Sequence, residues 1–193
     1  MTVAAFLDRD GVINKKAPEG SYVTSWAEFE FLPGVPAALR ALRDAGFQLI
    51  VVTNQRGIAR GVMSQAAVDT IHERMNVALA EEGAAVDAVF VCPHDQGTCQ
   101  CRKPGTALFA HALERFPDIS LTGSLVVGDS IGDLEAGQRL GFMNFLVGTG
   151  ERAAQIERWA AERGIVVRGV APSLVDLVVD PSFRKILARG RAE

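Results

Sequence analysis

Short apolar runs that could form buried strands alternate along this chain with amphipathic segments long enough for helices. We expect strands at residues 3–7, 47–52, 86–91, 124–127 and 142–147, and helices at residues 35–45, 64–82, 105–116 and 131–140. Glycine just beyond the ends of the first two helices supports these boundaries. Strands that alternate with helices of this length form a parallel sheet covered on both faces. The pattern therefore predicts an α/β fold with a Rossmann-like, doubly wound parallel sheet.

The length and composition of the chain fit one globular domain. It has 193 residues, of which 48% are hydrophobic and 22% charged, and this suits a single domain over residues 1–193. The net charge of −3 argues against binding to a nucleic-acid backbone. No apolar run is long enough to span a bilayer, and residues 1–10 lack the pattern of a secretory signal. We expect a cytoplasmic monomer with no nucleic-acid or membrane partner.

The last part of the chain gives weaker signals. Residues 151–163 have the pattern of a peripheral helix, whereas residues 174–179 fit a helix or an edge strand equally well. Residues 181–193 are rich in arginine and lysine. We expect them to form a basic tail or a frayed helix.

All three cysteines and one histidine lie within the segment CPHDQGTCQC at residues 92–101. Three thiolates and an imidazole suit tetrahedral zinc, and four protein ligands make a closed, structural site. We therefore expect Cys92, His94, Cys99 and Cys101 to bind zinc. The alternative is three reduced cysteines that are neighbours by chance, but a histidine stands between them at ligand spacing. The absence of a disulfide framework also fits a reducing compartment.

Polar residues follow four of the predicted strands at their carboxyl ends, where open parallel sheets bind ligands. In chain order these are Asp8 and Asp10, then Thr53, Asn54 and Gln55, then Arg102 and Lys103 beyond the cysteine segment, and finally Asp129, Ser130 and Asp133. Carboxylates gathered at one edge need a cation, and hard oxygen ligands indicate magnesium. The chemistry that fits is phosphoryl transfer to an aspartate, with a second carboxylate as general acid and base. Asp133 can also be explained as an acid at a helix start.

Four segments together resemble the signature motifs of the haloacid dehalogenase superfamily of phosphatases. They are FLDRDGVIN at 6–14, VTNQ at 52–55, CRKP at 101–104, and VGDS at 127–130 with Asp133. More narrowly, TNQRGIARG at 53–61 and the cysteine segment are similar to the D-glycero-D-manno-heptose 1,7-bisphosphate phosphatase branch. Histidinol-phosphate phosphatases share the architecture of that branch. The resemblance runs in order from about residue 3 to residue 150.

The resemblance implies a role for each matching residue. Asp8 would be the nucleophile and Asp10 the general acid and base, and magnesium would be held by Asp8, the Asp10 backbone carbonyl and Asp129. Thr53 and Lys103 would contact the transferring phosphoryl group. The substrate would be bound by Arg9, Glu19, Tyr22, Asn54, Gln55, Arg60 and Arg102, with Ser130 and Asp133 supporting the site.

Many members of this superfamily cover the site with a cap domain inserted after the first or the third strand. Here the intervals 8–47 and 92–103 are too short to hold a folded cap. We therefore expect an open site, shaped by the loop at residues 14–32 and by the cysteine segment.

The function implied by the resemblance is magnesium-dependent hydrolysis of the position-7 phosphate of heptose 1,7-bisphosphate, through an aspartyl phosphate. This would serve nucleotide-activated heptose synthesis for a surface polysaccharide. Histidinol phosphate is the alternative substrate, and it needs the same catalytic residues but a site for an amine. A non-catalytic, zinc-stabilised interaction protein is the alternative from another class, although such a protein has no use for both Asp8 and Asp10. The acidic charge disfavours a polynucleotide substrate.

Overall fold

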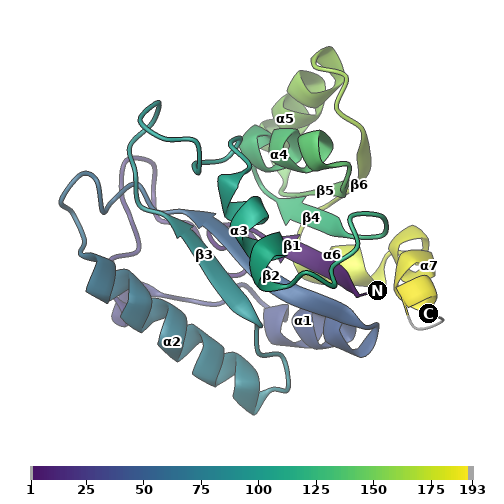
Figure 1. Ribbon diagram of the computed structural model, residues 1–193, viewed down its shortest axis with the longest axis horizontal. Coiled ribbons are helices and arrows are strands. Elements are labelled where there is room, and N and C mark those ends of the chain that lie inside the picture. The colour runs from purple at the N-terminus through teal and green to yellow at the C-terminus, as the bar shows by residue number, and fades with distance from the viewer. Residues whose placement is uncertain (1, 191–193) are drawn as a thin grey trace.

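A six-stranded parallel sheet lies between two layers of helices in the computed structural model, which describes residues 2–190 (Figure 1). The strands are β1 (Val3–Leu7), β2 (Phe47–Asn54), β3 (Ala88–Cys92), β4 (Leu125–Gly128), β5 (Met143–Val147) and β6 (Val167–Ala171). Their order across the sheet is β3-β2-β1-β4-β5-β6, and every neighbouring pair is parallel. The chain winds outward on one side of β1 and then on the other, which is the predicted doubly wound topology. The order reverses between β1 and β4, where such sheets open a crevice for ligands.

The helices cover both faces of the sheet. They are α1 (Val35–Asp44), α2 (Gln65–Glu81), α3 (Ala107–Arg115), α4 (Ile131–Leu140), α5 (Gly150–Glu162), α6 (Leu174–Val179) and α7 (Pro181–Gly190). Apolar side chains of α1, α2, α6 and α7 pack against one face, and those of α3 and α4 against the other, with α5 next to α4. Successive residues of β1 serve both layers, because side chains alternate along a strand: Leu7 belongs to the first core and Phe6 to the second.

The C-terminal part of the chain differs from the sequence-based expectation. Strand β6 was not predicted, because Arg168 and Gly169 interrupt its apolar residues and alternate positions are exposed. Residues 174–179 are helical, and the hydroxyl of Ser173 caps the helix by accepting from the backbone N–H of Asp176 at 3.2 Å.

Of the two expectations for this segment, a helix is confirmed for residues 181–190, which form α7, and a basic tail is wrong there. Phe183 in this helix is 1% exposed and packs edge-on against Phe145 at 4.8 Å between ring centroids. Burial of Phe183 therefore holds this helix against the body, although the segment is rich in basic residues. Residues 191–193 of the predicted tail lie outside the described residues.

Neither interval considered for a cap contains a folded domain. Between Asp8 and Phe47 the chain forms only the short 3-10 helix η1 (Trp26–Glu28) and α1, and residues 93–103 contain no helix or strand. Stacking of Trp26 on Phe29, with ring centroids 5.0 Å apart, packs the long loop after β1 against the body. No helix within residues 2–190 is long and apolar enough to cross a membrane.

Candidate active site

The carboxyl ends of the central strands open into a cavity of about 400 Å³. Loop residues 16–23 form one wall. The carboxyl ends of β1, β2, β3 and β4 with the segments that follow them, and Arg152 after β5, form the rest. The polar lining residues are Asp8, Asp10, Lys16, Glu19, Ser21, Tyr22, Thr53, Asn54, Gln55, Arg102, Asp129, Ser130 and Arg152. The four polar strand ends recognised in the sequence therefore meet at one place.

Asp8 directly follows β1, and its side chain is only 12% exposed. Its Oδ1 accepts a hydrogen bond from the backbone N–H of Arg9 at 2.8 Å and lies 2.9 Å from Nζ of Lys103. Burial raises the pKa of Asp8 to about 7; Lys103 opposes the rise, and the carboxylates of Asp133 and Asp129 add to it. Additional positive charge at this position would therefore favour the ionised, nucleophilic form.

Lys103 lies beneath the cavity and is 7% exposed. Its Nζ donates to the backbone carbonyl of Val52 at 2.6 Å and lies 2.6 Å from Oδ1 of Asp133 as well as close to Asp8. Burial alone would lower the pKa of Lys103, but the carboxylates of Asp133 and Asp8 outweigh it and hold the pKa above its ordinary value. The ammonium is therefore a fixed positive charge beside the candidate nucleophile.

The carboxylate of Asp10 faces the cavity, and side chains on its opposite side hold it by hydrogen bonds. It accepts hydrogen bonds from Arg9 at 2.8 and 2.9 Å, from Asn14 at 3.0 Å and from Gln55 at 2.8 Å. Burial alone would raise the pKa of Asp10, but Arg9 and the other donors lower it below its usual range. Asp10 is thus held as a carboxylate in one orientation.

Asp129 has the properties expected of a metal ligand. Its Oδ2 pairs with the ammonium of Lys16, while its buried Oδ1 has no hydrogen-bond partner among the described residues. Carboxylate oxygens of Asp8, Asp129 and Asp133 lie within 4.8 Å of one another. Gly11, at φ +94°, leaves room for this group, because a Cβ there would lie 2.2 Å from Oδ2 of Asp129. Hard oxygen donors with an unsatisfied member fit magnesium.

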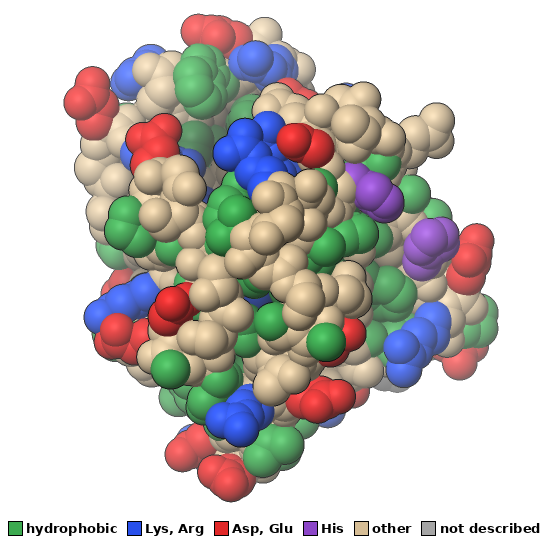
Figure 2. Space-filling model, turned by 90° about the vertical axis from the view of Figure 1, so that its left-hand side faces the viewer, with side chains coloured by type: hydrophobic (Ala, Val, Ile, Leu, Met, Phe, Trp, Pro, Cys, Tyr) green, Lys and Arg blue, Asp and Glu red, His purple; other side chains and the backbone are tan. Residues whose placement is uncertain are grey.

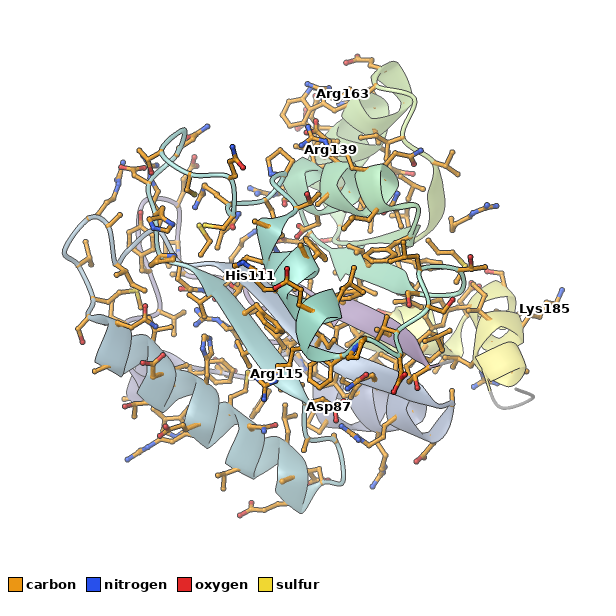
Figure 3. All side chains as sticks on the ribbon, viewed as in Figure 1. Asp87, His111, Arg115, Arg139, Arg163 and Lys185 are labelled. Carbon is orange, nitrogen blue, oxygen red and sulfur yellow. The ribbon has the colours of Figure 1, made fainter. Side chains whose placement is uncertain are left out.

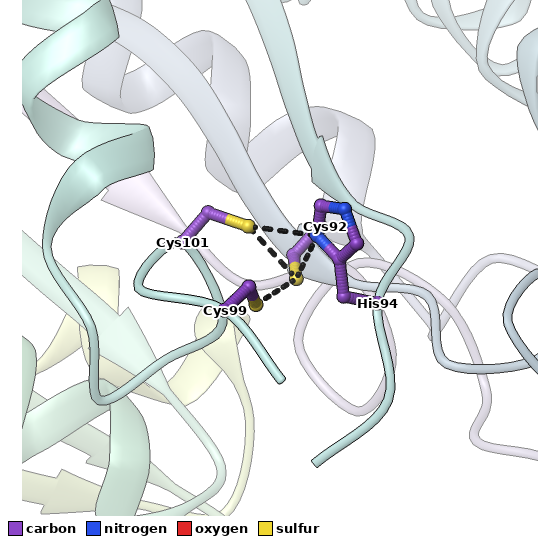
Figure 4. A group of neighbouring side chains, drawn as sticks. All are labelled: Cys92, His94, Cys99 and Cys101. Carbon is purple, nitrogen blue, oxygen red and sulfur yellow. Dashed lines mark hydrogen bonds between the residues drawn. The ribbon is translucent and has the colours of Figure 1, made fainter. Parts of the chain in front are cut away.

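The cysteine and histidine side chains converge on one another (Figure 4), in the segment that leads to Arg102 of the cavity lining. The Sγ of Cys92 lies 3.6 Å from that of Cys99 and 3.3 Å from that of Cys101, and Nδ1 of His94 lies 3.1 Å from Sγ of Cys101. Zinc–sulfur bonds of about 2.3 Å in a tetrahedron place sulfur atoms about 3.8 Å apart, close to these separations. The cluster therefore fits zinc. An ion pair between Arg56 and Asp95 ties this segment to the loop after β2.

Asp133 and Ser130 have partners within the protein. Ser130 donates its hydroxyl proton to Asp133, whose carboxylate also accepts from the backbone N–H of Ser130 at 3.2 Å. Asp133 therefore caps the start of α4, and its other oxygen holds Lys103. The explanation of Asp133 as an acid at a helix start is therefore confirmed, and its role in supporting the active site stays a prediction.

The structure separates the predicted substrate contacts into three groups. Glu19, Tyr22, Asn54, Gln55 and Arg102 line the cavity, and Asn54 also grips the backbone of Lys103 at 3.0 and 3.3 Å. Arg60 is exposed and lies outside the lining residues. Arg9 does not fit its predicted role, because its side chain is fully buried and points at Asp10 instead of the cavity.

Two cations in the cavity wall were not predicted. Lys16 belongs to the loop that was expected to shape the site, so its charge could have been used to predict a contact with an anionic substrate. Arg152 stands in the first turn of α5, in a part of the chain without a recognisable motif. Together with Arg102 they place three positive side chains around the cavity.

The topology and the four polar strand ends define a phosphatase of the haloacid dehalogenase type. The sequence profile described as polynucleotide kinase 3 phosphatase matches residues 2–146. The chain belongs to this family of phosphoric monoester hydrolases.

Relatives within the family carry a more specific name. The D-glycero-alpha-D-manno-heptose-1,7-bisphosphate 7-phosphatase of Mycobacterium bovis is 47% identical over 131 residues, which cover 67% of this chain and 68% of the relative. The D-glycero-beta-D-manno-heptose-1,7-bisphosphate 7-phosphatase of Bordetella bronchiseptica is 42% identical over 146 residues, 75% of this chain and 79% of the relative. A crystal structure of the D,D-heptose 1,7-bisphosphate phosphatase from B. bronchiseptica, complexed with magnesium and phosphate, has a TM-score of 0.78 and 36% identity, and covers 91% of this chain and 95% of that one.

Proposed function

We propose that this phosphatase removes the position-7 phosphate of D-glycero-D-manno-heptose 1,7-bisphosphate in the cytoplasm, as a monomer. The observation that carries the proposal is the arrangement of Asp8, Asp10, Lys103 and Asp129 at the base of a cavity ringed by cations. Similarity to relatives named for this reaction supports the same substrate. The product would be a heptose 1-phosphate for the synthesis of a nucleotide-activated heptose.

The residues divide the chemistry between them. In the free site Asp10 is a carboxylate, and the negative charge of the bound phosphate favours its protonation. A carboxylate oxygen of Asp8 attacks the phosphorus, the bond from phosphorus to the sugar oxygen breaks, and the protonated carboxyl group of Asp10 gives its proton to the leaving oxygen. The resulting Asp10 carboxylate then takes a proton from a water molecule that attacks the aspartyl phosphate, which frees phosphate and restores Asp8. The ammonium of Lys103 neutralises charge on the phosphoryl oxygens, and the hydroxyl of Thr53 donates a hydrogen bond to them.

The metal sites complete this proposal. Magnesium would be held by the carboxylates of Asp8 and Asp129 and by the backbone carbonyl of Asp10, and it would supply positive charge against the phosphoryl oxygens. The unsatisfied, buried Oδ1 of Asp129 supports this assignment. Zinc at the Cys92 cluster would stay structural and would hold the segment that carries Arg102 and Lys103.

A second phosphate on the substrate explains the cations of the cavity. The buried Nη1 of Arg102 has no hydrogen-bond partner among the described residues, and an unsatisfied guanidinium donor is well suited to a phosphate oxygen. Lys16 and Arg152 line the same cavity. Histidinol phosphate carries an amine in place of a second phosphate, so these cations disfavour it as the substrate.

The family description names a polynucleotide phosphatase, but the face shown in Figure 2 gives no support for that substrate. A protein that binds a nucleic-acid backbone needs a continuous basic surface. On the face shown in Figure 2, lysine and arginine side chains are interspersed with aspartate and glutamate. The net charge of −3 agrees with this picture.

The test is magnesium-dependent phosphate release from the two anomers of heptose 1,7-bisphosphate and from histidinol phosphate, compared by kcat/KM. We expect a bisphosphate to be preferred, and the alpha anomer in particular, because the M. bovis relative has the higher identity. Asp8→Asn is the matched inactive variant, with an expected loss of at least about 10³-fold in kcat. Preference for histidinol phosphate would overturn the substrate, and an active Asp8→Asn variant would overturn the nucleophile.

A further inference from the structure

A buried arginine supports the candidate general acid and base from the side away from the cavity. Arg9 is 0% exposed. Its Nη2 donates to both carboxylate oxygens of Asp10 at 2.8 and 2.9 Å, and its Nε lies 3.3 Å from Oδ1. A guanidinium fork that meets a carboxylate in this way fixes the orientation of both groups. Arg9 therefore determines where the Asp10 carboxylate points.

The remaining end of the Arg9 guanidinium is held by a histidine from α2. His72 is 7% exposed, and its Nε2 lies 3.2 Å from Nη1 of Arg9. Because arginine can only donate, Nε2 must be the acceptor, and the imidazole must be neutral with its proton on Nδ1. The charged groups near this imidazole are Arg9, Asp10 and Asp69.

The three residues form a chain of contacts that runs from α2 to the reaction centre. Asn14 and Gln55 hold the same Asp10 carboxylate at 3.0 and 2.8 Å, but neither of them positions Arg9. Of the described residues, His72 alone contributes a side-chain acceptor to Nη1 of Arg9. Loss of that acceptor would leave a buried donor unsatisfied, which favours a different guanidinium position.

We propose that His72 and Arg9 are positioning residues for the reaction, and that they hold the Asp10 carboxylate in the orientation from which it exchanges protons with the leaving group and with water. The inference rests on the proposed role of Asp10. It differs from a structural role, in which the buried cluster would stabilise the fold without affecting proton transfer.

The choice of leaving group separates these two roles. A sugar alkoxide needs a proton as it leaves, whereas a nitrophenolate leaves as a stable anion. A displaced Asp10 therefore slows hydrolysis of the sugar phosphate more than hydrolysis of p-nitrophenyl phosphate, and kcat/KM reports this first step. A general loss of folded enzyme slows both reactions equally.

The experiment compares His72→Leu, which removes the acceptor, with His72→Gln, which keeps an acceptor near the same place. His111→Leu is the control, since His111 is exposed on α3 (Figure 3). Substrates are heptose 1,7-bisphosphate and p-nitrophenyl phosphate. We expect His72→Leu to lose about tenfold in kcat/KM on the bisphosphate, within the range for a misplaced catalytic group, and less than about twofold on the aryl ester. We expect His72→Gln to keep most of the wild-type kcat/KM on the bisphosphate, and His111→Leu to keep all of it.

Equal losses on both substrates, or no loss on either, would overturn the proposal. If His72→Leu does not fold, Arg9→Lys replaces it in the same comparison, since lysine keeps the charge but lacks the fork. Asp10→Asn tests the proposed proton-transfer role of Asp10 separately from the positioning residues. If that variant also loses equally on both substrates, the proton-transfer role of Asp10 is wrong, and the failure does not lie with the positioning residues alone.

Discussion

The ammonium group of Lys103 lies 2.6 Å from Oδ1 of Asp133, in a pair whose side chains are 3% and 2% exposed. The same nitrogen lies 2.9 Å from Oδ1 of Asp8. Lys103 is thus shared between a residue of the reaction centre and a residue that caps α4. The position of Asp133 at the start of α4 and the position of the positive charge beside Asp8 therefore depend on one another.

Asp133→Asn should destabilise the fold and impair catalysis together. The substitution removes one of the two carboxylates that pair with the buried Lys103. Its charge is then only partly compensated, so we expect the free energy of unfolding in urea to fall by about 3 kcal/mol. Glu135→Gln is the matched control on the same helix. Glu135 is half-buried and pairs with the exposed Arg139 and Arg163, so its substitution should cost less than about 1 kcal/mol. Similar losses in both variants would contradict the importance assigned to the Lys103 pair.

Arg102→Gln should weaken binding of the second phosphate without changing the chemistry. The guanidinium has an unsatisfied Nη1 beside the cavity, and a charged hydrogen bond contributes about 1.5–3 kcal/mol. We expect KM for heptose 1,7-bisphosphate to rise by about tenfold or more, with kcat nearly unchanged. KM for a sugar monophosphate should stay the same, and a parallel rise in both KM values would exclude a contact with the second phosphate.

Release of zinc should affect substrate binding before it affects turnover. Fresh, reduced protein is expected to yield one zinc ion per chain to a metallochromic dye when its thiols are modified. After chelation and the return of excess magnesium, KM should rise more than kcat falls, because the loop carrying Arg102 loses its anchor. Cys101→Ser should show the same change. Protein that releases no zinc under these conditions would defeat the assignment of the cluster.

His72 should make folding stability depend on pH. Burial, with the Arg9 charge adding to it, lowers the pKa of His72 from 6.5 to about 4. Between these values the unfolded chain binds a proton that the folded protein does not, so the free energy of unfolding rises with pH and levels off above about 6.5. The full effect corresponds to about 3 kcal/mol.

The measurement compares wild type with His72→Gln by urea unfolding at pH 4.5 and pH 7.5. The variant should lose part of the stability difference between the two pH values, whereas His111→Gln should keep it. An unchanged difference in His72→Gln would show that the imidazole is not held neutral in the folded protein.

Local patterns in the sequence account for the features that depend on neighbouring residues. The apolar run before Asp8 marks β1, and its carboxyl end places the two aspartates; the spacing of the three cysteines and His94 indicates the metal cluster in the same way. Arg9 was misassigned because the family resemblance placed it among the substrate contacts, whereas its buried side chain pairs with Asp10. Its partner His72 lies 63 positions away on α2, and no spacing rule connects them. The contact of Lys103 with Asp133 and the packing of Phe183 on Phe145 are tertiary contacts of the same kind.

The central position of β1 has a consequence for protein synthesis. Residues 5–7 pair with residues 125–127 of β4 on one side, and residues 3–7 pair with residues 47–51 of β2 on the other. A nascent chain that has left the ribosome only as far as β3 can complete one half of the sheet, but β1 still has an open edge there. The nucleophile is translated before β2 and β4, yet its surroundings are assembled only after β4 has emerged. Premature termination before β4 would therefore yield no partially active enzyme.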